Sequence, residues 1–393
     1  MEHRRSKKYR FPWRQGNRYR LLVDGHCFFP AMLESIEAAQ QYVLLEMYLF
    51  ESGKVTDRFI TALTDAVARG VHVRLLLDGF GSLGLDNKDR LRLMEGGVLL
   101  GIYNPLRLGR WQRNLFRDHR KLLLVDGAVA YTGGAGITDN FDPAAHPEQF
   151  WHEAMLEIRG PVVADWQSLF VEVWNRWSER RLQLPSLPLL PPGVRRGCRG
   201  RVVAQRSFPG RSEVMRSHIS RIRGARQRVW FTTAYFVPSW KLRRALRQAA
   251  GKGADVRLLL PGPLTDHPAV RQVSRRHYES LLRSGVRIYE YQPRFLHAKV
   301  LLCDDWVSIG SSNLDRWNYH WNLEANQELI DPQVTEQVQE LFLGDFAVSR
   351  EVDYQSWRQR SWRRRLQEGI WYAVSAIVTR LTEKRGKHPG TEE

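Results

Sequence analysis

Cysteine is scarce in this chain, and so are the patterns that mark a zinc site, a nucleotide-binding loop or a membrane span. Three cysteines, Cys27, Cys198 and Cys303, occur among 393 residues. Their odd number and their spacing exclude a disulfide framework or a zinc site and fit a reducing compartment. No run of 18 apolar residues occurs, so we expect no transmembrane helix. We also find no glycine-rich nucleotide loop and no cluster of metal ligands, and we therefore predict no cofactor and no metal.

Acidic residues are few relative to basic ones. The chain has 60 Lys and Arg against 42 Asp and Glu, a formal net charge of +18. A surface of this sign attracts polyanions, which here means nucleic acid, an anionic membrane or a phosphate-bearing substrate. Hydrophobic residues nevertheless make up 43% of the chain. This is the balance of a folded protein, and it excludes wholesale disorder.

The length and an internal repeat predict two domains. A chain of 393 residues is too long for one ordinary hydrophobic core. The stretch ARGVHVRLLLDG (68–79) matches GKGADVRLLLPG (251–262), and in each half strand-like apolar runs alternate with helical periodicity. Such alternation is typical of an α/β sheet. We therefore predict two tandem α/β domains, each a mostly β sheet flanked by helices.

A proline-rich stretch marks the boundary between the halves. Four prolines fall between residues 185 and 192, and a cluster of glycine and arginine follows. Because proline excludes helix, we interpret this stretch as an interdomain linker, the alternative being a loop inside one domain. The predicted organisation is a basic N-terminal tail at 1–15, a first domain at 16–180, a linker at 181–200, a second domain at 201–345 and a basic, aromatic C-terminal tail at 346–393.

Each half also carries one copy of the motif H-x-K-x4-D. The two copies consist of His119, Lys121 and Asp126, and of His297, Lys299 and Asp304. Both copies run into apolar strand-like stretches. On a strand, side chains two residues apart point to the same face, so the His and Lys of each copy project together. The aspartates lie out of this register and open turn-like sequences, so they either fix a hairpin turn, which the pattern favours, or contact the substrate.

A histidine and a lysine that project together suit phosphate chemistry. Lysine places a positive charge against non-bridging oxygens, and a neutral imidazole attacks phosphorus or moves a proton. If the two halves face each other, two His–Lys pairs converge on one phosphate at the pseudo-twofold interface. One imidazole then forms a phosphohistidine. The other protonates the leaving alcohol and afterwards deprotonates the incoming acceptor.

A turn of small residues follows each motif. The second turn has the sequence GSSN and offers backbone N–H groups to phosphate oxygens, together with the hydroxyl of Ser311 and the amide of Asn313. The first turn has the sequence GGAG and offers backbone donors only. Its glycines, Gly133 and Gly134, therefore either bind phosphate or let the chains pack closely.

Two glutamates are candidates to orient the histidines. Glu153 lies 34 residues after His119, and Glu324 lies 27 residues after His297. Each interrupts an apolar strand-like run, where an unpaired carboxylate is costly. A nucleophilic imidazole needs an acceptor for its second nitrogen, and these carboxylates can supply it. The alternative for each glutamate is a half-exposed strand position.

The duplicated motif, with Gly-Ser-x-Asn behind its second copy, resembles the phospholipase D superfamily. The stretches HRKLLLVDGAVAYTGG, FLHAKVLLCDDWVSIGSSNLD and NLEAN are similar to the bacterial cardiolipin synthases, most of all to the shorter type B that lacks N-terminal membrane helices. The resemblance covers about residues 16–345. It implies transfer of a phosphatidyl group between two phosphatidylglycerol molecules, which yields cardiolipin and glycerol without a metal.

The resemblance also implies roles for single residues. The positions that match the family's catalytic and supporting residues are His119, Lys121, Asp126, Glu153, His297, Lys299, Asp304 and Glu324. By analogy His119 is the nucleophile and His297 is the acid/base, although the near-symmetric halves allow the reverse. One departure is Gly136, which stands where synthases of this type usually carry asparagine. A side-chain amide from the first half is therefore in question.

The C-terminal tail predicts contact with a membrane surface. Arginines and tryptophans from Trp357 to Arg365 precede an apolar stretch at 370–378, which is too short to cross about 30 Å of hydrocarbon. Basic and aromatic residues beside such a stretch suit an interfacial helix on an anionic leaflet, the alternative being a terminal helix packed on the protein's own core. We expect a peripheral protein on the cytoplasmic face of the bacterial cell membrane, with phosphatidylglycerol as substrate and no obligate protein partner.

Two other functions are compatible with the same motifs. A hydrolase uses the same site on phospholipid or on nucleic acid, since a basic surface with 14 Trp also suits DNA, although nucleic acid is the less favoured partner. Transfer to another alcohol is a variant of the first function. A non-enzymatic anion-binding module leaves both His–Lys pairs without a role. Two histidines near the first motif, His146 and His152, either line the site or lie at the surface, and the surface is favoured.

Overall fold

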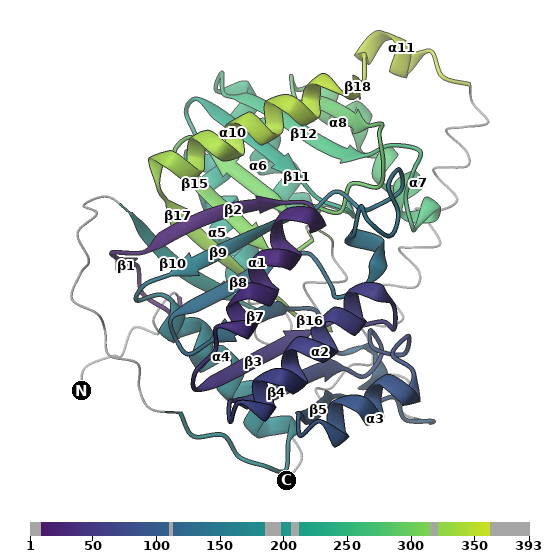
Figure 1. The fold of residues 1–393 in the computed structure, drawn as a ribbon. Helices are drawn as coiled ribbons and strands as arrows, with labels where there is room; N and C mark the ends of the chain where they lie inside the picture. Colours follow the sequence, from purple (N-terminus) through teal and green to yellow (C-terminus); the bar gives the residue numbers. More distant parts are fainter. Residues whose placement is uncertain are drawn as a thin grey trace.

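The computed structural model describes residues 9–109, 113–184, 198–205, 212–313, 315 and 321–361. Within these ranges no helix is both long enough and apolar enough to cross a bilayer. The chain forms two α/β halves that pack against each other, with the first half in purple to teal and the second in green to yellow in Figure 1.

The first half is built around a seven-stranded sheet. Its elements are β2 (Arg18–Val23), α1 (Gly25–Glu37), β3 (Tyr42–Met47), α2 (Lys54–Ala68), β4 (His72–Asp78), α3 (Asn87–Glu95), β5 (Leu99–Tyr103), β6 (Arg117–Asp118), β7 (Lys121–Val125), β8 (Val129–Gly133), β9 (Ala154–Arg159) and α4 (Val163–Trp177). All six residues of β3 are buried, as expected for a strand that is covered on both faces. Helix α2 is amphipathic and buries one face, including Phe59 and Leu63, against the sheet.

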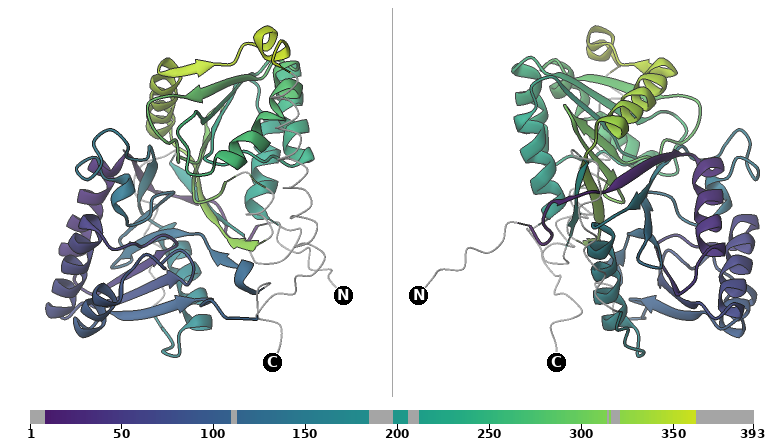
Figure 2. Two further views of the ribbon diagram at one scale, coloured as in Figure 1. Left: turned by 90° about the vertical axis from the view of Figure 1, so that its right-hand side faces the viewer. Right: turned by 60° about the vertical axis from the view of Figure 1, so that its left-hand side comes forward.

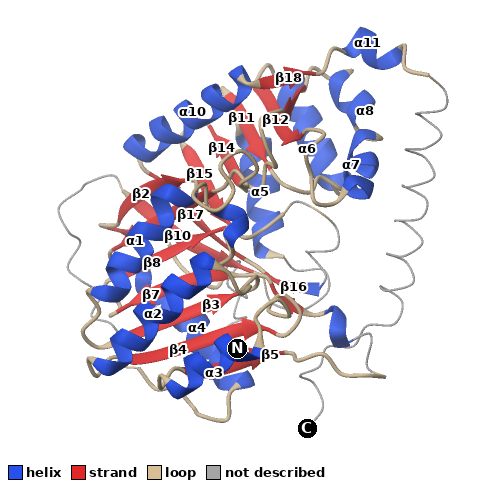
Figure 3. Cartoon of the chain, turned by 45° about the vertical axis from the view of Figure 1, so that its right-hand side comes forward, coloured by secondary structure: helices blue, strands red, loops and turns tan. Residues whose placement is uncertain are grey.

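The second half repeats this plan. Its elements are β10 (Arg199–Ala204), α5 (Glu213–Gly224), β11 (Arg228–Thr232), α6 (Trp240–Gly251), β12 (Asp255–Pro261), α7 (Pro268–Arg275), α8 (Tyr278–Leu282), β13 (Arg287–Tyr291), β14 (Val300–Cys303), β15 (Trp306–Gly310), β16 (Asn322–Leu323), β17 (Ala325–Ile330), α10 (Pro332–Ala347), β18 (Ser349–Glu351) and α11 (Tyr354–Arg358). Figure 3 shows the strands of both sheets in red beside their blue helices.

The two sheets have the same topology. The strand order is β2-β9-β8-β7-β3-β4-β5 in the first sheet and β10-β17-β15-β14-β11-β12-β13 in the second. In each sheet the last three strands of this order are parallel and the others are antiparallel. Strands β1 (Arg14–Gln15) and β18 extend the second sheet at its two edges. The predicted pair of α/β repeats, each a sheet flanked by helices, is confirmed.

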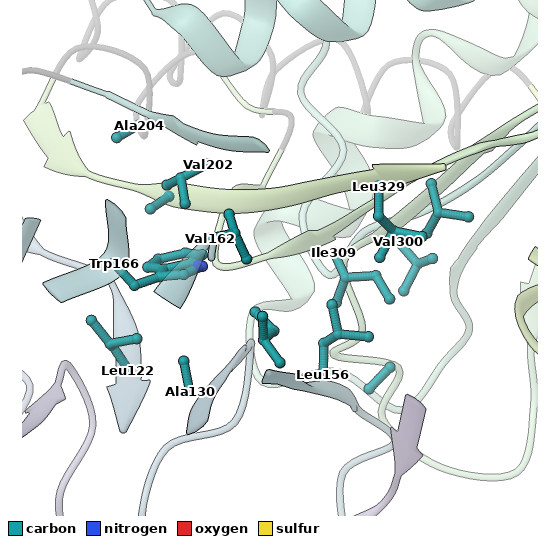
Figure 4. Packing of buried hydrophobic residues seen from close by; sticks show 14 of the residues in the cluster. Leu122, Ala130, Leu156, Val162, Trp166, Val202, Ala204, Val300, Ile309 and Leu329 are labelled. Carbon is teal, nitrogen blue, oxygen red and sulfur yellow. The ribbon is translucent and has the colours of Figure 1, made fainter. Parts of the chain in front are cut away.

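Three hydrophobic cores hold these layers together. Helices α1 to α3 cover the outer face of the first sheet and α5, α6 and α8 cover the outer face of the second, on opposite sides of the molecule (Figure 2). The third core lies between the sheets, where α4 and α10 pack with residues of both halves (Figure 4). Within it the Trp166 indole N–H donates to Oε1 of Gln327 across the halves at 2.9 Å. This close packing fixes how the two halves face each other.

The described parts of the two predicted tails pack on the fold. Phe11 is buried in the core between the sheets, and Arg14 forms an ion pair with Asp165 at 2.6 Å. Trp357, expected at a lipid surface, is 4% exposed and stacks on Tyr278, so this tryptophan is not available to a membrane. The remainder of the expected interfacial helix, including the apolar stretch at 370–378, lies outside the described residues, as do residues 185–197 of the linker. The domain limits 16–180 and 201–345 stay a prediction.

Candidate active site

The His and Lys of each motif lie where the parallel strands end. Lys121 is the first residue of β7 and pairs with Met47, the last residue of β3. In the second half Lys299 precedes β14, whose first residue Val300 pairs with Thr232, the last residue of β11. The loops that follow the parallel strands therefore surround both motifs. The carboxyl edge of parallel strands is the usual place for ligand sites in α/β folds.

The two halves exchange backbone pairings at this edge. Strand β6 of the first half pairs in parallel with β16 of the second, and His152 forms a parallel bridge with Leu296. As a result the backbone N–H of His119 donates to the carbonyl of Leu323 at 3.0 Å, and the N–H of His297 donates to the carbonyl of His152 at 2.8 Å. The backbone of each motif histidine is thus held by the other half.

The two glutamates pair with the histidines in a crossed manner. Nδ1 of His297 lies 2.6 Å from Oε2 of Glu153, and Nδ1 of His119 lies 3.0 Å from Oε1 of Glu324. Each glutamate therefore belongs to the half opposite to its histidine, although sequence distance places it beside its own. Both carboxylates are fully buried, and His119 and His297 are 8% and 6% exposed, respectively. The Glu153 contact holds Nδ1 of His297 by a hydrogen bond, whereas the contact of Glu324 with Nδ1 of His119 is an ion-pair distance without hydrogen-bond geometry.

The two lysines lie against the same groups. Nζ of Lys121 donates to the carbonyl of His119 at 2.6 Å. Nζ of Lys299 lies 2.9 Å from Nδ1 of His297 and 3.5 Å from Oε2 of Glu153. Both ammonium groups are buried, so their charges act on the pocket with little screening by water.

Burial and these charges set the protonation states. Burial lowers the pKa of His119 well below its usual value, and the charges of Lys121 and Lys299 lower it further. Burial and the same two lysines lower the pKa of His297 in the same way. Burial also lowers the pKa of Lys121 to about 7. A lysine of each half thus acts on both imidazoles, and the free imidazoles are neutral.

The glutamates respond in the opposite sense. Burial raises the pKa of Glu153 to about 7, against the charge of Lys299, and raises the pKa of Glu324 to about 8, against the charge of Lys121. Even with the lysines beside them, both glutamates therefore take up a proton near neutral pH, and without the lysines their pKa values would rise further. The charge balance of the pocket depends on both halves at once.

The motif aspartates lie at the far end of the strands. Asp126 follows β7, five residues and about 16 Å from Lys121 along an extended strand, and its carboxylate accepts three backbone N–H bonds from residues 40–42, each of 2.8 Å. Asp304 accepts the equivalent N–H bonds from residues 226–228 at 2.9–3.0 Å. Both aspartates have a φ of 52° in their turns. Both residues lie in turns, but their carboxylates bind the backbone that leads into β3 and β11, and the structure does not bring them to the histidines.

The two small-residue turns differ in what they offer. A Cβ on Gly134 would lie 2.1 Å from Oε2 of Glu153, and a Cβ on Gly133 would lie 2.5 Å from Sδ of Met155. Both glycines are therefore required for close packing. In the second turn the hydroxyl of Ser311 donates to Oε2 of Glu324, so this side chain holds the glutamate.

The asparagine of the second turn has a different environment from its counterpart in the first. Oδ1 of Asn313 accepts a hydrogen bond from the hydroxyl of Thr233 at 3.2 Å. Its buried Nδ2 has no hydrogen-bond partner among the described residues. The first turn has Gly136 instead, where a Cβ would lie 2.6 Å from Cβ of Leu49. The close approach of Leu49 thus explains why this half lacks the asparagine.

Aromatic residues that the sequence analysis missed line the pocket. The ring of Tyr48 lies 4.7 Å from that of His119, and Nζ of Lys121 lies 5.0 Å from the centre of the same tyrosine ring. On the other side Trp151 lies 5.2 Å from His297. The position of Trp151 two residues before Glu153 was the available signal. Tyr48 follows an ordinary buried strand and carries no signal of its own.

Of the two histidines outside the motifs that were expected at the surface, His146 lies there and His152 does not. His146 is exposed. His152 is 3% exposed, because Nδ1 lies 2.8 Å from Asp24 and Nε2 lies 3.1 Å from Asp345. Two carboxylates make burial of this imidazole favourable.

Known proteins share both the sequence and the fold. The family model described as "Cardiolipin synthase, PLD-like domain" matches residues 32–174 and 218–346. Cardiolipin synthase A of Pseudomonas aeruginosa is 35% identical over 374 residues, which cover 94% of this chain and 75% of that protein. The cardiolipin synthase of Geobacillus thermodenitrificans is 33% identical over 362 residues, 91% of this chain and 72% of that protein.

A solved structure agrees with the fold. The crystal structure of phosphatidylserine synthase from Haemophilus influenzae has a TM-score of 0.69 and 12% identity, and the match covers 94% of this chain and 96% of that one. Assignment to the shorter type of synthase stays a prediction, since the Pseudomonas relative is named cardiolipin synthase A. With two matched PLD-like segments that fall in the two structural repeats, the chain belongs to the cardiolipin synthase family of the phospholipase D superfamily.

Proposed function

We propose that this protein transfers a phosphatidyl group from one phosphatidylglycerol to another, giving cardiolipin and glycerol. The observation that supports this most is the crossed arrangement of His119 with Glu324 and of His297 with Glu153, beside two buried lysines. Two oriented imidazoles on one pocket are the requirement for a displacement in two steps. The printed names of the relatives point to the same reaction.

In the first step Nε2 of His119 attacks phosphorus. A P–N bond forms, the bond from phosphorus to the glycerol oxygen breaks, and His297 gives a proton to that oxygen. In the second step His297 takes the proton of the incoming hydroxyl, whose oxygen attacks phosphorus while the P–N bond breaks. Glu324 on Nδ1 stabilises the positive charge that develops on His119 during the first step.

The bound phosphodiester explains how His297 comes to carry the proton that the first step needs. In the free pocket the two lysines lower the pKa of His297, so this imidazole is neutral. A phosphodiester anion beside Lys121 and Lys299 offsets their charge and raises the pKa of His297. The imidazole then carries the proton that it gives to the leaving group.

Two further groups are proposed to hold the phosphate. The lysines act as point charges on the non-bridging oxygens. The unpaired Nδ2 of Asn313 offers a donor that a phosphate oxygen can accept, since a buried donor without a partner is costly. Ser311, Gly133 and Gly134 are better explained by their contacts with the glutamates and with Met155.

We also propose that the protein binds an anionic bilayer, at the cytoplasmic face, through the loops around the pocket. Six large hydrophobic side chains are exposed on the loops that follow β4, β5 and β12 and at the start of α6. They are Phe80, Leu83, Leu106, Leu108, Trp240 and Leu264. Exposed Arg107 and Lys241 lie beside three of them. Apolar side chains with adjacent cations suit the interface of an anionic membrane, and a lipid phosphate enters the pocket from there.

The reaction is tested with phosphatidylglycerol vesicles and, in parallel, with supercoiled plasmid. We expect cardiolipin and free glycerol in equal amounts and no nicked DNA. His119→Ala and His297→Ala should abolish turnover, while His146→Ala, an exposed histidine, should leave it unchanged. Phosphatidic acid without cardiolipin, or nicked plasmid, would replace the proposal by a hydrolase.

Membrane contact has its own test. The double variant Leu83→Glu/Leu108→Glu should co-sediment less with phosphatidylglycerol vesicles than the unmodified protein does. Its co-sedimentation with vesicles of neutral lipid should be unchanged. Leu343→Glu, an exposed leucine on α10, is the matched control and should bind as the unmodified protein does. Equal binding of both variants contradicts the role of the loops.

A further inference from the structure

A buried cluster of four charged side chains joins the two halves beside His297. Nδ1 and Nε2 of His152 lie 2.8 Å from Oδ1 of Asp24 and 3.1 Å from Oδ1 of Asp345. Nη2 of Arg294 donates to Oδ2 of Asp24 at 2.5 Å. Asp24 and His152 belong to the first half, whereas Arg294 and Asp345 belong to the second. We call these four residues the interface quartet.

The quartet supports His297 through two connections. The carbonyl of His152 accepts the backbone N–H of His297 at 2.8 Å and that of Ala298 at 3.1 Å. The next residue, Glu153, accepts the hydrogen bond from Nδ1 of His297, and its own N–H donates to Oδ1 of Asp24 at 3.1 Å. A displacement of His152 therefore moves the backbone and the side-chain support of His297 together.

The positions that correspond to the quartet beside His119 carry no charge, although different buried ion pairs, Arg117 with Asp78 and Arg120 with Glu46 and Asp118, flank that histidine. The carbonyl of Leu323 accepts the N–H of His119 just as that of His152 accepts the N–H of His297. The residues that occupy the positions of His152, Asp24 and Arg294 in the repeat are Leu323, Gln205 and Phe116. Leu323 packs against the apolar core between the sheets. The two motif histidines are thus held by different forces.

The backbone of Asp24 indicates that the quartet is a constrained feature. Its φ is 62° and its ψ is 161°, a conformation that side-chain-bearing residues rarely adopt. Its N–H donates to the carbonyl of Glu153 at 2.9 Å, and its carboxylate binds His152, Glu153 and Arg294. The surrounding contacts hold this strained residue in place against the segment that supports His297.

We propose that His152 is a positioning residue for His297, so that the placement of this histidine depends on the interface quartet, whereas that of His119 does not. The groups that face His152 from the elements packed against it are Asp24, Asp345, Arg294, Glu153 and Tyr291, whose ring stacks on the imidazole at 5.2 Å. For turnover the inference rests on the proposed function. For stability it does not.

The charge of His152 sets the pH range over which the interface quartet stabilises the fold. Burial lowers the pKa of His152, but the hydrogen bonds to Asp24 and Asp345 outweigh burial and raise it to about 9. A group whose folded pKa is raised stabilises the fold fully below its unfolded pKa of about 6.5 and loses that contribution as pH rises through the folded value. Above about pH 9 the imidazole is neutral, so two buried carboxylates face one guanidinium. The attraction within the interface quartet is then weaker.

Two variants at this position separate charge from shape. His152→Gln keeps hydrogen-bonding groups and removes the charge. His152→Arg keeps a positive charge at every pH, and its planar guanidinium can stack on Tyr291 as the imidazole does. Leu323→Gln places the same neutral side chain at the equivalent position beside His119 and is the matched control.

The experiment measures thermal midpoints and kcat and KM with phosphatidylglycerol vesicles from pH 6 to 9.5. We expect the Tm of His152→Gln to lie below that of the unmodified protein at pH 6.5 and the gap to close between pH 7 and 9.5. For Leu323→Gln any gap should be independent of pH. His152→Gln should lower kcat at pH 7 by about 10²-fold with little change in KM. His152→Arg should restore kcat and keep it above pH 9.

Each contrary result overturns the proposal. A Tm gap for His152→Gln that stays constant with pH shows that His152 is not a buried charge. A closing gap with unchanged kcat shows a structural clamp that does not position His297. If the unmodified protein makes no cardiolipin, the proposed function fails, and the Tm series still decides whether the quartet titrates as described.

Discussion

Gly134 provides the sharpest test of the crossed pairing. A Cβ at this position would lie 2.1 Å from Oε2 and 2.6 Å from Cδ of Glu153. Gly134→Ala therefore forces the Glu153 carboxylate to retreat by roughly 1.5 Å before it reaches ordinary van der Waals contact. The carboxylate belongs to the first half, but the group that loses its partner is His297 of the second half, whose Nδ1 lies 2.6 Å from Oε2.

The expected loss follows from this displacement. A misplacement of about 1 Å in a catalytic array lowers the rate about 10²-fold, which is about 2.7 kcal/mol of activation free energy. Loss of the carboxylate that orients a catalytic histidine costs up to about 10⁴-fold in serine proteases. We therefore expect kcat for cardiolipin formation to fall by about 10² to 10⁴ in Gly134→Ala. KM should change little, because the lysines that hold the phosphate remain.

The assay measures the initial rate of cardiolipin formation from phosphatidylglycerol vesicles, and circular dichroism confirms that each variant is folded. Glu153→Gln should show the same loss, and the double variant should be no worse than either single one, because both changes remove one interaction. Ser311→Ala alters the equivalent position beside Glu324, where a Cβ already exists, and should lose about 10-fold or less. A kcat for Gly134→Ala within threefold of the unmodified protein would refute the crossed support of His297.

Three further outcomes follow from the structure. Asp126→Asn and Asp304→Asn should each lower the free energy of unfolding by about 1–3 kcal/mol and leave kcat nearly unchanged, which urea unfolding and the rate assay measure; a selective loss of kcat contradicts the turn role. Since burial and the lysines lower the pKa values of both histidines, whereas burial raises those of Glu153 and Glu324 to about 7 and about 8, the free-enzyme acid limb of kcat/KM should lie near pH 7 to 8 and report the glutamates; a limb below 6 contradicts this. Gly344→Ala, in α10 with no atom near the added Cβ, should raise stability by about 0.5–1 kcal/mol at unchanged kcat, and a loss of stability would show a hidden contact.

Local patterns were sufficient for the repeat and for the motif residues. Apolar runs such as residues 42–45 of β3 and 122–125 of β7 are buried as strands because they are hydrophobic throughout. The off-register position of Asp126 and Asp304 predicted their place in a turn, where backbone N–H groups surround both carboxylates. The repeat and the turn positions depend on residues close together in the chain, where periodicity and turn chemistry carry the information, whereas the N–H donors to the two carboxylates lie 76 to 86 residues away.

Long-range contacts were beyond the same reasoning. His152 was expected at the surface, because nothing near it in sequence reveals that Asp24 and Asp345 flank it. Trp357 was assigned to a lipid interface, whereas it stacks on Tyr278 and belongs to the core under the outer helices of the second half. In both cases the partner lies far away in the chain, and burial depends on which surfaces meet.

The sequence by itself determined two α/β repeats, one His–Lys pair in each and the residue types that phosphate chemistry requires, since these follow from spacing and periodicity. The tertiary structure decided which glutamate lies beside which histidine, why Gly136 replaces an asparagine and why the interface quartet supports His297 and not His119. The physical reason is that the halves pack through a shared apolar core and exchange short strands at its edge. Partners across that edge are set by the geometry of packing, which spacing along the chain does not encode.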